Sequence, residues 1–253
     1  MPADGDLWVS YSVNKEDMWI SRIPVPVEIN ASAHADDDFS KNKSIAELTD
    51  WNIYSPVWAP VSLKDQWLKL QDKDPFDYAK VERKIPASKE LKVSFDLKAG
   101  QNNKGTLQIE FLDENGIACS RMELTDDGIF RLKGGSRFAN MMKYEAGKVY
   151  HVEAVLSTAD RNIQVYVDGK RVGLRMFYAP VAAIERIVFR TGTPRTFPTV
   201  DTPADQTYDL PNAGAQDPLA EYGIANVKTS STDKDASSAF LTVSYTHLTL
   251  PTT

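Results

Sequence analysis

The stretch that decides the fold is Leu91-Lys92-Val93-Ser94-Phe95-Asp96-Leu97-Lys98, in which apolar and polar residues alternate without interruption. Successive side chains of a β-strand point to opposite faces, so this order gathers the apolar side chains on one face and the polar ones on the other. It predicts a strand with one face against a core. Similar alternation recurs at residues 107–111, 150–156, 163–167 and 187–189.

Turn signals separate these segments. Asn115-Gly116, Asp127-Gly128 and Asp168-Gly169 are dipeptides that tolerate the positive φ angles of tight hairpin turns. Helical signals are few, and the best is a short turn at residues 44–48, with Ser44 as its cap and Glu47 at the capping-box position. The whole pattern predicts an all-β fold, an antiparallel two-layer β-sandwich.

Composition narrows the function classes. The chain has 253 residues, 42% of them hydrophobic, which suits a folded protein with a sizeable core. Its formal net charge is −6 and its basic residues are scattered, so we expect no nucleic-acid partner. No apolar run reaches the roughly 20 residues needed to span a bilayer, and the first residues lack the pattern of a signal peptide. Cys119 is the only cysteine, which excludes an intrachain disulfide.

The chain divides into segments of different character. We expect residues 49–228 to form the sandwich, with a closing strand at 222–228, and residues 30–48 to form a polar linker. Residues 1–29 precede this linker as a hairpin. We expect a frayed tail over residues 229–253, whose last part, 243–253, resembles a translated sequencing adaptor and is excluded from fold reasoning.

The N-terminal hairpin is predicted from two apolar runs, residues 7–13 and 18–23, which carry Trp8 and Trp19. A lone two-stranded hairpin cannot bury enough apolar surface to be stable in water. The tryptophans therefore predict that the partner strands lie outside this chain and that it is the tail of a longer protein.

The hairpin GDLWVSYSVNKEDMWISR, residues 5–22, resembles the end of a β-propeller of the sialidase-like (BNR repeat) superfamily. Three further segments resemble the sandwich that follows such propellers in secreted polysaccharide-degrading proteins of gut Bacteroidetes; they are WNIYSPVWAP (51–60), DPFDYAK (74–80) and IERIVFRTG (184–192). The resemblance implies a jelly-roll sandwich of the concanavalin or laminin-G type, and a secreted, periplasmic or cell-surface location. The Asp-box repeat of the family, Ser-x-Asp-x-Gly-x-Thr-Trp, is absent, and the catalytic residues of sialidases would lie on propeller blades that precede Met1.

The resemblance implies an accessory module without catalysis of its own. The sandwich would support the upstream propeller and bind a glycan or polysaccharide, within a parent glycoside hydrolase or polysaccharide lyase. Two alternatives stay open: the sandwich completes the active site of the parent enzyme, donating Arg190 or the loop that carries Asp201, Asp205 and Asp209, or it is a purely structural domain. The strand motif Glu-x-Asp-x-x-Glu of sandwich glycosidases does not occur, and the cluster from Glu110 to Glu114 runs into a turn and is interpreted as a solvated hairpin tip.

Three residues are the candidate carbohydrate-binding residues: Trp58, Tyr78 and Arg190. An exposed aromatic ring can stack on the apolar face of a sugar, although Trp58, between two prolines, is also placed to pack against a propeller. Asp72, Asp74 and Asp77 are weak candidates for a structural calcium, because they offer oxygen ligands but lack the glycine and terminal glutamate of an EF-hand loop. No other cofactor is expected.

Overall fold

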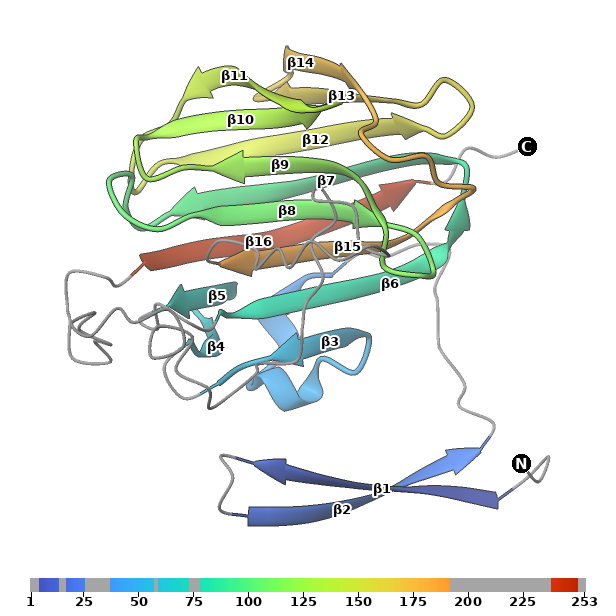
Figure 1. Ribbon diagram of the computed structural model, residues 1–253. Coiled ribbons are helices and arrows are strands. Elements are labelled where there is room, and N and C mark those ends of the chain that lie inside the picture. Colours follow the sequence, from blue (N-terminus) through green and yellow to red (C-terminus); the bar gives the residue numbers. More distant parts are fainter. Residues whose placement is uncertain are drawn as a thin grey trace, which may run out of the picture.

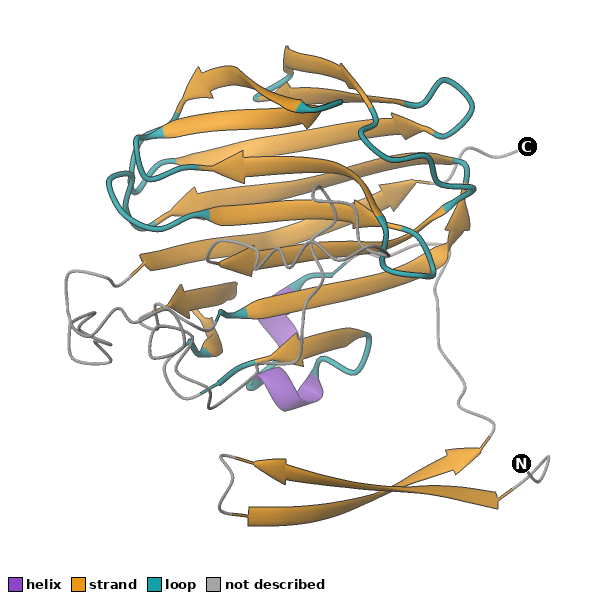
Figure 2. Cartoon of the chain, viewed as in Figure 1, coloured by secondary structure: helices purple, strands orange, loops and turns teal. Residues whose placement is uncertain are grey.

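The computed structural model describes residues 5–13, 17–25, 37–56, 59–72, 78–191 and 238–249, the last range as backbone only. The described elements are strands, apart from two short 3-10 helices beside β3 (Figures 1 and 2). In chain order they are β1 (Gly5–Val13), β2 (Asp17–Val25), η1 (Phe39–Lys41), η2 (Ile45–Glu47), β3 (Trp51–Tyr54), β4 (Val61–Lys64), β5 (Trp67–Asp72), β6 (Lys80–Ser88), β7 (Glu90–Ala99), β8 (Leu107–Leu112), β9 (Ala118–Leu124), β10 (Ile129–Gly134), β11 (Arg137–Lys143), β12 (Val149–Ser157), β13 (Asn162–Val167), β14 (Lys170–Met176), β15 (Ile184–Thr191) and β16 (Ser238–Thr249).

Two seven-stranded sheets form the body of the molecule. The front sheet has the order β11-β10-β9-β8-β15-β6-β3, and the back sheet the order β14-β13-β12-β7-β16-β5-β4 (Figure 1). Neighbouring strands are antiparallel, as at β8 with β9 and at β12 with β7. The predicted all-β, antiparallel two-layer sandwich is confirmed.

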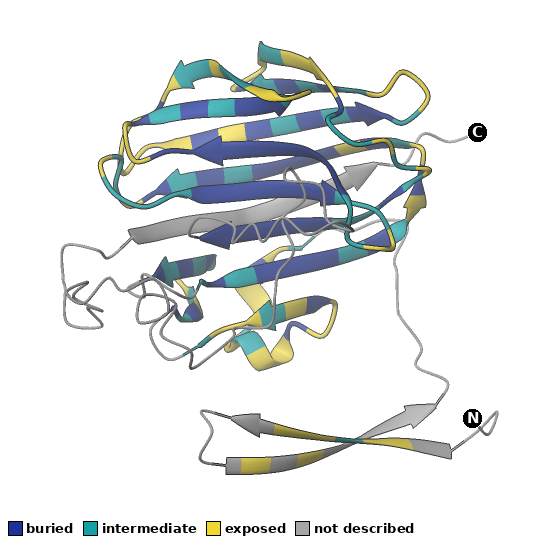
Figure 3. Ribbon diagram, viewed as in Figure 1, coloured by how far each residue is buried: buried dark blue, intermediate teal, exposed yellow. Residues whose placement is uncertain are grey.

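The core lies between the two sheets. Leu91, Val93, Phe95 and Leu97 of β7 are all at most 1% exposed, as the alternation predicts. Phe95 meets Phe189 of the front sheet edge to face, with ring centroids 5.1 Å apart. Burial of each such side chain stabilises the fold by roughly 1.5–3 kcal/mol, so the facing strands hold the layers together (Figure 3).

The predicted hairpin turns are present. Gly116 and Gly128 have φ angles of +81° and +75° between β8 and β9 and between β9 and β10. Asp168 and Gly169 between β13 and β14 both have positive φ, as a type I′ turn requires. These turns connect consecutive strands as antiparallel neighbours.

Residues 37–50, most of them in the expected linker, pack on the sandwich. Phe39 and Leu48 belong to the core, and the Phe39 ring lies 5.9 Å from that of Trp51. The capping prediction for Ser44 is wrong, because its side chain makes no cap hydrogen bond and η2 is a single three-residue turn. The Glu47 carboxylate instead accepts a hydrogen bond from the Lys43 backbone N–H, at 2.9 Å.

The back sheet includes β16, which lies between β5 and β7. This strand follows the range 49–228 that we expected for the sandwich, and it contains residues 243–249, which resemble an adaptor. Residues 240–245, Phe-Leu-Thr-Val-Ser-Tyr, are rich in β-branched and aromatic side chains, and these favour a strand whatever their origin. The expected strand at 222–228 lies outside the described residues.

The N-terminal hairpin is a two-stranded sheet of its own, formed by β1 and β2. Most of its described apolar side chains are exposed, among them Trp8 at 64%, Met18 at 76% and Ile20 at 69%. The side chain of Trp19 lies outside the described residues. That the hairpin belongs to a preceding propeller stays a prediction.

Candidate functional site

The outer face of the front sheet carries the candidate site. Residues directly opposite one another on neighbouring strands share a face. Gln108 lies opposite Arg190, and Glu110 lies opposite Arg121. These residues alternate with core residues such as Ile109, so polar and charged side chains cover one face while apolar ones fill the interior.

Ion pairs and hydrogen bonds connect this polar face. Arg121 Nε donates to Glu110 Oε1 at 2.7 Å, and Glu110 Oε2 lies 3.6 Å from Arg190 Nη2. Arg190 Nη2 also donates to Gln108 Oε1, at 2.7 Å. These four residues are between 1% and 5% exposed, so the network is held in a largely solvent-excluded layer, where electrostatic interactions are stronger than in water.

Burial and charge act in opposite directions on Arg121. Burial alone would lower the pKa of this guanidinium, but the neighbouring Glu110 carboxylate stabilises the charged form, and the net effect raises the pKa. Arg121 therefore stays charged. Burial raises the pKa of the nearby Tyr178 hydroxyl above its usual range. The Tyr178 ring also receives a cation–π contact from Lys133, whose Nζ lies 4.5 Å from the ring centroid.

Aromatic rings lie at both ends of the polar face. On the β3 and β6 side, the Tyr54 and Tyr78 rings pack with centroids 5.3 Å apart, and Arg190 Cζ lies 5.4 Å from the centroid of Tyr78. On the β10 and β11 side, Arg131 Cζ lies 4.3 Å from the centroid of Phe138. Tyr54 is 38% exposed, so its ring offers the accessible apolar surface that a sugar face can stack on.

The structure brings together two of the predicted carbohydrate-binding residues, Tyr78 and Arg190. It places Arg190 at 1% exposure beneath the Tyr78 ring, so its guanidinium is enclosed by protein. Trp58 lies outside the described residues. Tyr54, which the sequence ranks below Trp58 as a sugar-stacking ring, lies beside Tyr78 with 38% of its surface exposed.

The acidic candidates have different positions. Asp72 is buried, and its Oδ2 accepts a hydrogen bond from Thr191 Oγ1 at 2.9 Å. Asp74 and Asp77 lie outside the described residues. Within the described ranges there is no group of three His, Cys, Asp or Glu side chains that could hold a metal ion.

The interpretation of Glu110 as part of a solvated turn is wrong. Glu110 lies within β8 at 4% exposure, paired with Arg121, and the tip itself begins at Asp113, which follows the strand. The sequence could not show this, because the partner arginine comes from the next strand and the pairing depends on register.

The chain is thus a two-layer antiparallel sandwich whose front sheet has a polar outer face flanked by aromatic rings. Residues 51–206 match the family model named Sialidase-like, CBM domain. The chain therefore belongs to this family of sialidase-associated carbohydrate-binding modules, and the resemblance seen in the sequence is confirmed at that level.

Solved structures agree with this assignment. A structure named as a sialidase is 77% identical and covers 99% of this chain and 21% of its own, with a TM-score of 0.76. This chain thus spans about a fifth of that sialidase chain. A Crh5 transglycosylase (10% identity, 88% of this chain and 86% of its own, TM-score 0.59) and the Emp47p carbohydrate recognition domain (9%, 88% and 97%, 0.53) share the fold alone. Comparison with curated protein sequences produced no match. Among the described helices, none has the length and apolar character to cross a membrane.

Proposed function

We propose that this chain is a non-catalytic module that holds a parent glycan-degrading enzyme against its glycan. The observation that carries the proposal is the family match over residues 51–206, which covers the strands of the polar face up to Thr191. The parent enzyme is a sialidase-like glycoside hydrolase of the cell exterior, to which the exposed apolar hairpin of β1 and β2 attaches the module through a preceding propeller.

The glycan contact is the aromatic pair of Tyr54 and Tyr78. The Tyr54 ring supplies an accessible apolar face, and Tyr78 is held against it by its own ring contact and by Arg190 from below. Lys80, with Nζ 3.5 Å from Glu82 Oε2, offers polar groups next to the rings for sugar hydroxyls. A rigid aromatic surface with polar neighbours suits a sugar, which has both CH faces and hydroxyl groups.

The enclosure of Arg190 disfavours the rival function, completion of the active site by this residue. Its side chain is 1% exposed, and it is engaged with Gln108 and Glu110 of the same sheet. A guanidinium held in this way cannot extend into the cleft of a neighbouring domain without leaving both partners. We therefore assign Arg190 a positioning role for Tyr78.

Binding experiments on the purified chain test the proposal. A glycan array identifies ligands, and titration calorimetry with the best one then compares Tyr54→Ala and Tyr78→Ala with the parent chain. The matched control is Tyr166→Ala, a partly exposed tyrosine on β13 of the back sheet. We expect roughly tenfold weaker binding for the two front-sheet variants, a loss of about 1.4 kcal/mol, because each removes a ring that the sugar contacts. We expect no change for the control. The proposal fails if the array shows no glycan binding or if all three variants bind alike.

A second experiment addresses the parent enzyme. Hydrolysis of a soluble substrate and of an immobilised glycan is measured with and without this module. Loss of activity on the immobilised glycan alone supports a binding role. Loss of activity on both substrates supports the completion of the active site instead.

A further inference from the structure

On one side of the sandwich, the outermost strands of the two sheets lie next to each other, and the charged side chains of both strands are all basic. β11 is the outermost strand of the front sheet, and β14 is the outermost strand of the back sheet. These two strands carry five basic residues and no acidic one. The five, which we call the cationic edge, are Arg137, Lys143, Lys170, Arg171 and Arg175, and all are exposed.

The charge of this edge is not neutralised within the described part of the chain. The ion pairs of the described residues include none of the five side chains, and Arg175 Nη1 donates to the Leu174 carbonyl oxygen at 2.8 Å. The chain as a whole has a formal charge of −6. The edge is therefore a local concentration of positive charge on an acidic protein.

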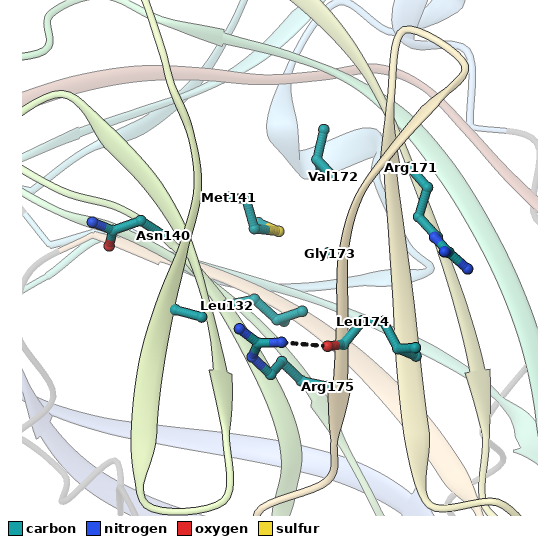
Figure 4. A pocket seen from close by; sticks show the side chains of 9 residues that line it. Leu132, Asn140, Met141, Arg171, Val172, Gly173, Leu174 and Arg175 are labelled. Atoms are coloured by element: carbon teal, nitrogen blue, oxygen red, sulfur yellow. Dashed lines mark hydrogen bonds between the residues drawn. The ribbon is translucent and has the colours of Figure 1, made fainter.

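A cavity of about 320 Å³ lies between the two edge strands (Figure 4). Leu132, Met141 and Val172 line it together with Asn140, Arg171 and Arg175, and the surface that it exposes is more polar than apolar. Its volume is at the lower end of the range for small-ligand pockets, which begins near 300 Å³. Two residues of the cationic edge, Arg171 and Arg175, thus line a groove of mixed polar and apolar character.

Two glycines allow the sheets to approach so closely. A Cβ atom on Gly173 would lie 2.7 Å from Met141 Sδ, and one on Gly134 would lie 2.7 Å from Arg175 Cβ. The Arg175 stem therefore lies directly over the β10 backbone. This contact fixes the base of one arginine of the edge while its guanidinium reaches the surface.

Protection of the strand edges is one role for these charges, since charged side chains prevent edge-to-edge pairing with another chain. The same repulsion disfavours a second copy of this chain as the occupant, because each edge would present like charges to the other. The uniform sign and the adjoining groove favour a ligand of opposite charge with apolar patches, which is the chemistry of an acidic saccharide.

We propose that the cationic edge is a second glycan-binding site, for saccharides that carry carboxylate or sulfate groups. The proposal rests on the carbohydrate-binding function proposed above. Arginine donates paired hydrogen bonds to carboxylate or sulfate oxygens, the lysines add charge, and the groove receives the CH face of a sugar ring. Attraction between exposed charges is screened by salt over about 10 Å at 0.1 M, so binding at this edge weakens as salt is added.

Binding of the full chain to polymers of known charge tests the proposal. The edge variant combines Lys143→Gln, Arg171→Gln and Arg175→Met, the last of which keeps an unbranched stem over Gly134. The charge-matched control combines Lys41→Gln, Lys64→Gln and Lys89→Gln, three exposed lysines from elsewhere on the chain. Affinity electrophoresis uses a sulfated polysaccharide, a polyuronate, a neutral polysaccharide and a single-stranded oligonucleotide, with circular dichroism to check folding.

We expect the chain to bind at least one of the two anionic polysaccharides. The edge variant should bind it roughly tenfold or more weakly, because the loss of one charge-assisted hydrogen bond corresponds to about that factor. The affinity of the charge-matched control should change little. The preferred polymer tells carboxylate from sulfate. Equal losses in the edge variant and the control, no anionic binding, or stronger retention by the oligonucleotide would overturn the proposal. The Tyr54→Ala variant is measured beside these proteins with a ligand from the glycan array, so that the two sites are tested separately. If the chain binds array glycans but neither anionic polysaccharide, only the proposal for the cationic edge is refuted. If the chain binds no glycan at all, both proposed sites are refuted.

Discussion

Replacement of Glu110 by alanine tests the ion-pair network beneath the proposed sugar site. The Glu110 carboxylate contacts Arg121 at 2.7 Å and Arg190 at 3.6 Å, and all three side chains are at most 6% exposed. Removing one partner of a buried ion pair costs about 3–5 kcal/mol, because the remaining charge loses its compensation. That is a large part of the roughly 5–15 kcal/mol by which a protein is stable. Glu110→Gln keeps an oxygen acceptor for Arg121, so we expect a smaller loss, about 1–3 kcal/mol.

Urea unfolding followed by tryptophan fluorescence measures these losses as shifts in the transition midpoint at unchanged slope. The control is Glu153→Ala, which breaks the Lys92–Glu153 pair of 2.9 Å on the back sheet, where the lysine side chain is 50% exposed. Such a surface pair contributes less than about 1 kcal/mol. A double-mutant cycle with Arg121→Met isolates the pair itself. The reasoning is refuted if Glu110→Ala costs no more than Glu153→Ala.

Three further predictions concern other parts of the sandwich. Gly173→Ala introduces a Cβ 2.7 Å from Met141 Sδ. This overpacking should lower the free energy of unfolding by about 1–3 kcal/mol, seen as a lower melting temperature, and adding Met141→Ala should restore part of the loss. An unchanged melting temperature would contradict the close approach of the sheets. Burial raises the pKa of Cys119, so a thiol reagent at pH 8 should react with it only when urea unfolds the chain, and rapid reaction in native buffer would count against this. Burial also raises the pKa of Asp37, despite the opposing charge of Arg83. Because the folded state then holds this proton more tightly, stability from this group is present below the ordinary carboxyl pKa and is lost as pH rises through the folded value. Asp37→Asn should therefore reduce the fall of the urea midpoint as the pH rises above the ordinary carboxyl pKa, and an unchanged pH dependence would refute the assignment.

The core could be predicted from the sequence because its signal is local. The alternation from Leu91 to Leu97 needs no knowledge of other strands, and all four apolar positions are buried in β7. The same holds for turns such as Asp168-Gly169, whose positive φ angles follow from residue type. Each of these predictions depends on residues that are adjacent in the chain.

The contacts of the polar face could not be predicted, because the residues that pair on it are far apart in the sequence. β9 reads as Ala-Cys-Ser-Arg-Met-Glu-Leu, a pattern that suggests one solvated face, yet every residue in it is buried. Gln108 meets Arg190 across 82 positions of sequence, and only the strand order brings β8 beside β15. Alternation identifies which residues share a face, but it does not show what a polar side chain contacts there.

The packing of the expected linker, residues 30–48, could not be predicted for a related reason. Residues 30–48 are polar in composition, yet Phe39 and Leu48 anchor part of the segment in the core. Composition averages over a segment, whereas packing depends on individual side chains. The N-cap of η1 shows the same local determination, because the Asp38 carboxylate accepts from the Ser40 N–H at 2.9 Å and fixes the turn that presents Phe39.

The two proposed binding sites lie at opposite sides of the front sheet, since β3 and β11 are its first and last strands. Six inter-strand spacings of about 4.8 Å separate them by about 29 Å. Both sites are fixed to one rigid sandwich, so a ligand gains from the second contact only if it is long enough to reach both. For a short acidic oligosaccharide, the losses of affinity in the Tyr54 variant and in the edge variant should therefore be independent of each other. For a long acidic polysaccharide, either variant should lose most of the affinity that comes from contacting both sites at once. If polymer length made no difference to the affinity of the unmodified chain, the two surfaces would not act on the same glycan.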